Sequence, residues 1–181
     1  MFNIFIIIIY AILFGSAMKM ADLLGEHGLK WFKSSALLFG ILFGISGSLL
    51  ILNDNILANF FIALLIHWVL RFRIDSSEHG VAGAIMFTTF VLNLNSFVLN
   101  PLIFWITLIT FSIFGLLNDA ADRKDIKGFV AKLAKSQFHF FMVPLILIFF
   151  DISYWIILIA SFSFIISYEA IKFFFKTKGY R

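Results

Sequence analysis

Residues 35–52 read SALLFGILFGISGSLLIL, a run that contains no charged side chain. An α-helix needs about 20 such residues to cross the hydrocarbon core of a membrane. Runs of similar composition recur along the chain and are separated by short polar clusters. Hydrophobic side chains make up 62% of the 181 residues, and the mean hydropathy is +1.03. Because soluble domains are only about half apolar, the sequence predicts an all-α, polytopic membrane helical bundle.

Seven apolar runs predict seven transmembrane helices in one integral membrane domain that spans residues 1–181. The runs are too long and too uniformly apolar to be the alternating strands of a membrane barrel. We expect a kink at Pro144, because proline removes a helix hydrogen bond. The expected spans are 2–21, 35–52, 56–71, 81–92 (with an extension to 99 as the alternative), 101–117, 129–150 and 152–175.

The basic residues predict the orientation of these spans. All 14 Lys and Arg residues follow an odd-numbered run, precede an even-numbered run or lie in the C-terminal tail. Lys and Arg near the ends of spans stay on the cytoplasmic side. The N-terminus is therefore expected outside and the C-terminus in the cytoplasm. We expect an integral, multi-pass protein of the plasma membrane, with membrane lipid as its surroundings.

Other features of the composition exclude several classes of protein. The absence of Cys excludes disulfides, thiol catalysis and Cys-ligated metal centres. In a membrane protein, a net charge of +4 reflects the Lys and Arg residues that hold the cytoplasmic side in place. Nucleic acid is therefore not expected as a partner. The sequence carries no Walker, nucleophile-elbow, His-Glu-x-x-His or dinucleotide motif.

Small residues and one charged pair predict local contacts. Gly40, Gly44 and Gly47 lie on one face of the 35–52 run. Small residues on a shared face let membrane helices approach closely, so we predict a packing seam there. Glu169 and Lys172 are three residues apart and are expected to pair on the last helix.

The acidic residues concentrate on the predicted cytoplasmic side. Eight of the ten lie there, and Glu-His-Gly occurs twice, at 26–28 and at 78–80. All four histidines also lie in cytoplasmic loops or in the inner half of a span. Seven of the acids form three clusters, which follow the first, third and fifth runs: Asp22 and Glu26; Asp75 and Glu78; Asp119, Asp122 and Asp125.

The spacing within these clusters brings charges together. Lys19, Asp22 and Glu26 are three and four residues apart and would share one face of a helix. The three aspartates from 119 to 125 recur every third residue and would stack their carboxylates if the helix continues. Like charges that close are costly unless a cation lies among them. Carboxylate oxygens suit Mg²⁺ or Mn²⁺, and the neighbouring Arg123, Lys124 and Lys127 are the alternative cations.

Residues 118–125, NDAADRKD, resemble the aspartate-rich motif of UbiA-type intramembrane prenyltransferases. The motif of that family reads Asn-Asp-x-x-Asp-x-x-x-Asp at the cytoplasmic end of a membrane helix, and its acids hold Mg²⁺ on the diphosphate of a prenyl donor. The resemblance implies that Asp119 and Asp122 are metal ligands and that Arg123 and Lys124 contact diphosphate. Asp125 stands one residue early relative to the family pattern.

We therefore expect an integral membrane enzyme that acts on a lipid or prenyl phosphate or diphosphate at the cytoplasmic leaflet, with UbiA-like transferase chemistry. The expected cofactor is Mg²⁺ or Mn²⁺. The expected catalytic residues are Asp119, Asp122, Asp22 and Glu26. The expected phosphate-binding residues are Lys19, Arg71, Arg123 and Lys124. The expected metal ligands are Asp119, Asp122, Asp125, Asp75, Glu78 and His79.

Two alternatives remain at this stage. A small transporter or channel would need a polar path from Asp54, Asn93 or Asn95 on the outer side to His67 on the inner side. A non-catalytic membrane scaffold would bind a partner through its loops, and its acids would be solvated ion pairs. Only the enzyme requires the three acidic loops to converge.

Overall fold

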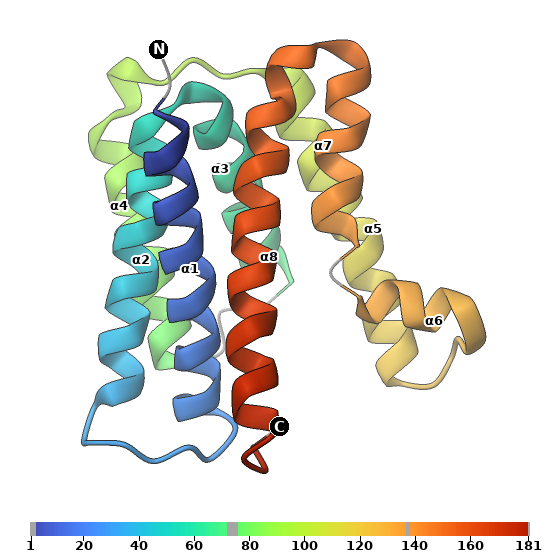
Figure 1. The fold of residues 1–181 in the computed structure, drawn as a ribbon. Coiled ribbons are helices and arrows are strands. Elements are labelled where there is room, and N and C mark those ends of the chain that lie inside the picture. The colour runs from blue at the N-terminus through green and yellow to red at the C-terminus, as the bar shows by residue number, and fades with distance from the viewer. Residues whose placement is uncertain (1–2, 72–75, 137, 181) are drawn as a thin grey trace.

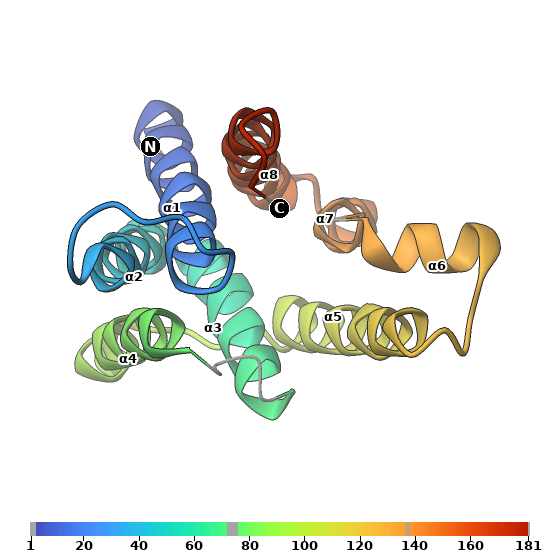
Figure 2. The same cartoon turned by 90° about the horizontal axis from the view of Figure 1, so that it is seen from below.

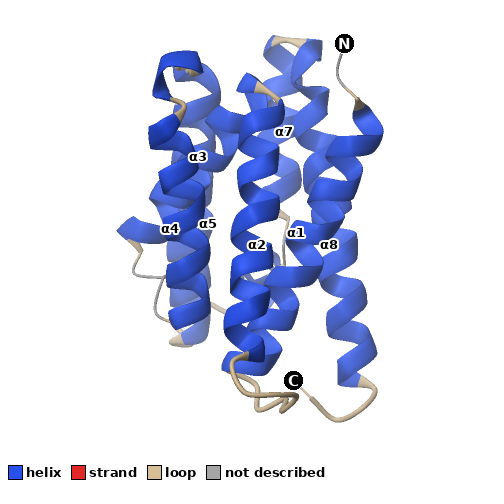
Figure 3. Ribbon diagram, turned by 90° about the vertical axis from the view of Figure 1, so that its left-hand side faces the viewer, coloured by secondary structure: helices blue, strands red, loops and turns tan. Residues whose placement is uncertain are grey.

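The computed structural model of the chain describes residues 3–71, 76–136 and 138–180. All regular structure in these residues is helical (Figure 3), so the predicted all-α class is confirmed. The elements in chain order are α1 (Ile4–Gly25), α2 (Ser35–Asn53), α3 (Asn55–Leu70), α4 (Ser77–Leu92), η1 (Leu94–Ser96), α5 (Pro101–Asp122), α6 (Gly128–Lys135), α7 (His139–Phe150), η2 (Ile152–Tyr154) and α8 (Trp155–Lys176).

Four helical segments are long and apolar enough to cross a membrane: α1, α2, α5 and the stretch Ile152–Lys176 that joins η2 to α8. The pair of α6 and α7 adds a fifth if it counts as one broken span. α3 and α4 have 16 residues each. At 1.5 Å per residue that is about 24 Å, less than the roughly 30 Å of hydrocarbon. The predicted count of seven spans and the predicted sides of the termini therefore stay predictions.

The sixth predicted run, residues 129–150, is divided between α6 and α7, and this break comes before Pro144, where a kink was expected. α6 ends at Lys135, α7 begins at His139, and the two helices are bent by 84°. α7 continues through Pro144, where the kink was expected. The change of composition explains the position of the break. α6 carries Lys132 and Lys135, which are costly in hydrocarbon, whereas α7 contains no Lys, Arg, Asp or Glu.

Most helices run along one bundle axis, and α6 lies across it (Figure 1). We call the end that carries residues 26–34, residues 123–127 and the C-terminus the basic end. Six helices form a closed circuit of neighbours, in which α1 packs on α2, α2 on α3, α3 on α5, α5 on α7, α7 on α8, and α8 on α1. α4 packs on the outside of this circuit against α2, and α6 packs against α5 (Figure 2).

Phenylalanine side chains join the six helices of this circuit. Phe14 of α1 contacts Phe61 of α3 and Phe164 of α8, with ring centroids 5.2 and 5.3 Å apart. Phe111 of α5 and Phe140 of α7 are 4.7 Å apart. Three further contacts close the loop: Phe140–Phe164, Phe60–Phe61 and Phe60–Phe111. Phe43 of α2 packs on Phe14. We call these seven residues the phenylalanine circuit.

The predicted glycine seam is confirmed between α2 and α4. A Cβ atom added at Gly40 would lie 2.6 Å from the backbone oxygen of Glu78, and one at Gly44 would lie 2.9 Å from the Cα of Ala82. A Cβ at Gly47 would lie 2.7 Å from the sulfur of Met86. The two backbones therefore approach more closely than any side chain would permit.

Substitution of Gly40 by Ala should destabilise the bundle. The added methyl meets the α4 backbone, which cannot rotate away as a side chain can, so we expect a loss of about 1–3 kcal/mol of unfolding free energy. Leu42→Ala on the same helix is the control, because Leu42 is largely exposed. Thermal and denaturant unfolding in detergent micelles would measure both. Equal effects of the two changes would contradict the seam.

Candidate functional site

A cavity of about 360 Å³ opens toward the basic end and is lined by residues from all eight α-helices. The four histidines of the chain all line it. Four members of the phenylalanine circuit, Phe43, Phe111, Phe140 and Phe164, form its apolar wall. The polar lining residues are Lys19, Asp22, Glu26, His27, His67, Arg71, His79, Asn118, Lys135, Ser136, His139 and Tyr168.

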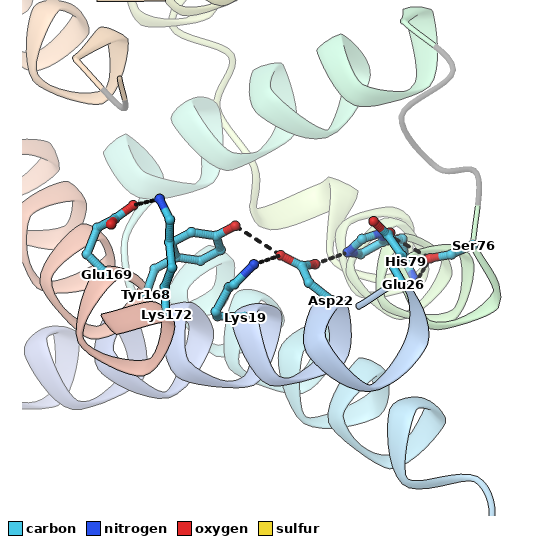
Figure 4. Close-up of polar contacts among 8 residues, drawn as sticks. All are labelled: Lys19, Asp22, Glu26, Ser76, His79, Tyr168, Glu169 and Lys172. Atoms are coloured by element: carbon cyan, nitrogen blue, oxygen red, sulfur yellow. Dashed lines mark hydrogen bonds and ion pairs between the residues drawn. The ribbon is translucent and has the colours of Figure 1, made fainter. Parts of the chain in front are cut away.

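Asp22 joins three polar side chains of the cavity (Figure 4). Its Oδ1 lies 3.0 Å from His79 Nε2. Its Oδ2 accepts a hydrogen bond of 3.0 Å from the Tyr168 hydroxyl and one of 3.4 Å from Lys19 Nζ. Asp22 is 7% exposed and Lys19 4%. Charges this deeply buried are tolerated only when they are paired and hydrogen-bonded, and this network satisfies both oxygens of the carboxylate.

Local sequence explains how these side chains meet. Lys19, Asp22 and Glu26 occupy the last turns of α1 and its C-cap, on the face that their spacing predicts. Ser76 is the N-cap of α4, where its hydroxyl accepts from the backbone N–H of His79. The same hydroxyl lies 3.0 Å from His79 Nδ1 and fixes the orientation of the ring. The first and second acidic clusters therefore meet through Asp22, Glu26 and His79, which is part of the convergence that the enzyme hypothesis requires. Of the third cluster's segment, 118–125, only Asn118 lines the cavity.

The electrostatics around His79 favour its charged form. His79 lies before residue 81, where the fourth predicted span begins. The hydrogen bond to Asp22 raises the pKa of His79 above its ordinary value, and the charges of Asp22, Glu26 and Glu78 act in the same direction, against the effect of burial. The raised pKa of His79 favours an ion pair between its ring and Asp22.

Asp22, Glu26 and His79 also form a set of possible metal ligands. Each offers one ligand atom, and these atoms lie within 4.8 Å of one another. Carboxylate oxygens suit Mg²⁺ and Mn²⁺, and imidazole suits Zn²⁺ and other transition metals. The mixed donor set fits a divalent cation, and Mn²⁺ is a suitable probe because it accepts both kinds of ligand. We call these three residues the acid–histidine triad.

Two other predicted metal ligands belong to the second cluster. Glu78 is 3% exposed and packs against Gly25 at the end of α1. Its Oε2 accepts from Ser77, whereas its Oε1 has no hydrogen-bond partner among the described residues. Asp75 lies outside the described residues.

The third acidic cluster is neutralised by basic side chains. Asp119 pairs with Arg71, Asp122 lies 2.9 Å from Lys135, and Asp125 lies 2.9 Å from Arg123. α5 ends at Asp122, so only the first two aspartates share a helix. Cationic side chains thus compensate the carboxylates, but of the three cations that the sequence offered only Arg123 does so, and the other two partners are Arg71 and Lys135. The metal-ligand role that the UbiA resemblance implies for this cluster stays a prediction.

The four predicted phosphate-binding residues divide into two groups. Lys19 and Arg71 line the cavity, whereas Arg123 and Lys124 are exposed outside it. Arg71 donates to the backbone oxygen of Gly115 at 2.6 Å and to Asp119. A Cβ at Gly115 would lie 2.4 Å from the Arg71 guanidinium, so the absence of a side chain there admits Arg71 to the cavity wall.

The structure adds residues that the sequence did not single out as site residues. His139 lines the cavity, and its Nδ1 is buried with no hydrogen-bond partner among the described residues. Tyr168 donates to Asp22 from α8. The clustering of histidines on one side of the membrane was the available signal for His139. Tyr168 lies in a phenylalanine-rich run and gave no such signal.

Comparison with known proteins yields no match: no protein-family profile, no curated protein and no solved structure is similar to this chain. The assignment of function therefore depends on the residues and their geometry.

Removal of the Asp119 carboxylate should affect stability more than removal of the Asp125 carboxylate. Asp119→Asn weakens an ion pair in which the Arg71 side chain is only 14% exposed, and we expect a loss of about 1–3 kcal/mol. Asp125→Asn removes a solvated pair and should leave the melting temperature unchanged. Unfolding of the two variants in detergent would test this. A stable Asp119→Asn protein that has lost divalent-cation binding would instead favour the role implied by the resemblance.

Proposed function

We propose that this protein is an integral membrane enzyme of the plasma membrane that acts on a lipid or prenyl phosphate or diphosphate at the cytoplasmic leaflet. In this proposal the acid–histidine triad holds a divalent cation. The observation that carries the proposal is the composition of the cavity, where all four histidines, two carboxylates and three cationic side chains meet an aromatic wall.

The two parts of the cavity suit the two parts of such a substrate. Lys19 and Arg71 can bind phosphate oxygens, and Arg71 can do so in the bidentate geometry that guanidinium permits. The phenylalanine wall can accept the apolar chain next to the phosphate. A bound divalent cation would neutralise the phosphate oxygens and orient the group as a Lewis acid.

The other polar groups have supporting roles in the proposal. The Tyr168 hydroxyl and Lys19 Nζ both contact Asp22 Oδ2 and hold that carboxylate in place. His67 and His139 line the same cavity. An imidazole ring can donate or accept a proton, so these two residues are candidates for moving a proton to or from an acceptor substrate. The transferase class follows the UbiA resemblance, and the metal is assigned to the triad.

The alternatives have less support. Neither Asp54 nor Asn93 lines the cavity. Asn59, near the opposite end of α3 from His67, is fully buried and bonded to the backbone of residues 98 and 100, and Phe60 and Phe61 follow it. Among the described residues, the cavity therefore gives no support to the polar path that a transporter requires. A scaffold has no need for the buried Asp22 network, which is costly to form.

Binding of Mn²⁺ to the purified protein tests the proposal, with electron paramagnetic resonance as the readout. We expect one site whose affinity rises when a prenyl diphosphate such as farnesyl diphosphate is added. Glu26→Gln should weaken binding at least tenfold without unfolding the protein, because the Glu26 side chain is 44% exposed. His79→Gln should have the same effect on binding.

Asp125→Asn is the matched control, since it also removes one carboxylate at the basic end but lies outside the cavity. Binding that is absent in the wild type, or equal in Glu26→Gln and Asp125→Asn, would reject the metal site. Binding that responds to Asp119→Asn and not to Glu26→Gln would move the site to the aspartate-rich motif.

A further inference from the structure

We propose that residues 123–135, which include α6, form a binding surface for the anionic phospholipid headgroups of the leaflet at the basic end. We call this segment the α6 surface. The proposal is independent of the enzymatic function proposed above and depends on three observations: charge, apolar exposure and the level of α6 along the bundle.

The charge of the α6 surface is strongly positive. It contains five of the 14 Lys and Arg residues of the chain and one acid, Asp125. Arg123 is paired with Asp125. Lys124, Lys127 and Lys132 are exposed and have no carboxylate partner within the described residues. Clusters of Lys and Arg at the end of a membrane helix attract anionic lipid headgroups.

Two apolar residues of α6, Phe129 and Val130, point away from the protein. Phe129 is 78% exposed and Val130 is 48% exposed, whereas Ala134 is buried. Lys132 lies beside Phe129 on the exposed side, since the two are three residues apart on the helix. A short helix with exposed aromatic and aliphatic side chains beside lysines is suited to the boundary between headgroups and acyl chains, where each kind of side chain meets its preferred surroundings.

The length of α5 indicates the level of α6 relative to a membrane. α5 has 22 residues, or about 33 Å, which is close to the roughly 30 Å of hydrocarbon that it would cross. Asp122 at the end of α5 lies 2.9 Å from Lys135 at the end of α6, so α6 lies where α5 leaves the hydrocarbon. Because α6 is bent by 84° from α7 and lies across the bundle axis (Figure 1), it runs along the membrane plane.

The α6 surface is continuous with the cavity. Ala134 and Lys135 belong to α6 and also line the cavity. Anionic lipids that gather on the α6 surface therefore lie next to the cavity on the α5–α6 side. This arrangement would raise the local concentration of any anionic lipid that enters the cavity.

The absence of Cys from the chain permits a direct test by site-specific labelling. Phe129→Cys would carry an environment-sensitive fluorophore, and the protein would be reconstituted into vesicles of phosphatidylcholine with or without phosphatidylglycerol. We expect blue-shifted emission that is quenched by lipids brominated near the headgroup end of their chains. Both effects should grow with phosphatidylglycerol and shrink as salt is raised.

A triple variant, Lys124→Gln/Lys127→Gln/Lys132→Gln, should abolish the dependence on phosphatidylglycerol while leaving the protein folded, because all three side chains are exposed. The same label at Ile152→Cys, which is 73% exposed in a connection that holds no Lys or Arg, is the matched control and should not respond to phosphatidylglycerol. Co-purified phosphatidylglycerol should fall at least twofold in the triple variant. Emission typical of water at position 129 would overturn the proposal. So would label emission that is the same in both vesicle types, together with a phosphatidylglycerol content that is the same in the wild type and the triple variant.

Discussion

The closed circuit of phenylalanine contacts is the interaction on which the rest of the structure depends. In a lipid environment the hydrophobic effect does not drive one helix onto another, so association relies on close packing. Aromatic pairs contribute about 0.5–1.5 kcal/mol each beyond burial, and here edge-to-face and tilted pairs join all six helices of the ring. α2 and α4 meet mainly along the glycine seam, and the Phe43 and His79 rings add one edge-to-face contact between them.

The circuit also determines where polar groups can gather. It closes the bundle on one side of the cavity, and the space left toward the basic end is filled by charged and imidazole side chains. Asp22 is central there, since α1, α4 and α8 all supply a partner for its carboxylate. A buried carboxylate that loses one partner is strongly destabilised. The network therefore couples the positions of three helices to the geometry of the site.

Much of the fold followed from composition and periodicity. Long apolar runs predicted the helices because hydrocarbon requires every backbone hydrogen bond to be satisfied within the segment. The glycine spacing predicted a packing seam on α2, though not its partner α4, and Glu169 and Lys172 pair at 2.8 Å as their spacing suggested. Helix lengths were less predictable. α3 and α4 are shorter than a full span, and the bend between α6 and α7 depends on how α6 packs against α5.

The sequence alone determined which residues could bind a metal ion or a phosphate group, and the tertiary structure decided which of them meet. Spacing along α1 placed Lys19, Asp22 and Glu26 on one face, because helical geometry is local. Their pairing with His79 depends on the packing of α4 across α2, which no local pattern encodes. The aspartates of residues 119–125 look equivalent in sequence, yet each meets a different basic partner. Long-range packing made that choice, because an ion pair forms only between side chains that the helices bring within a few ångströms.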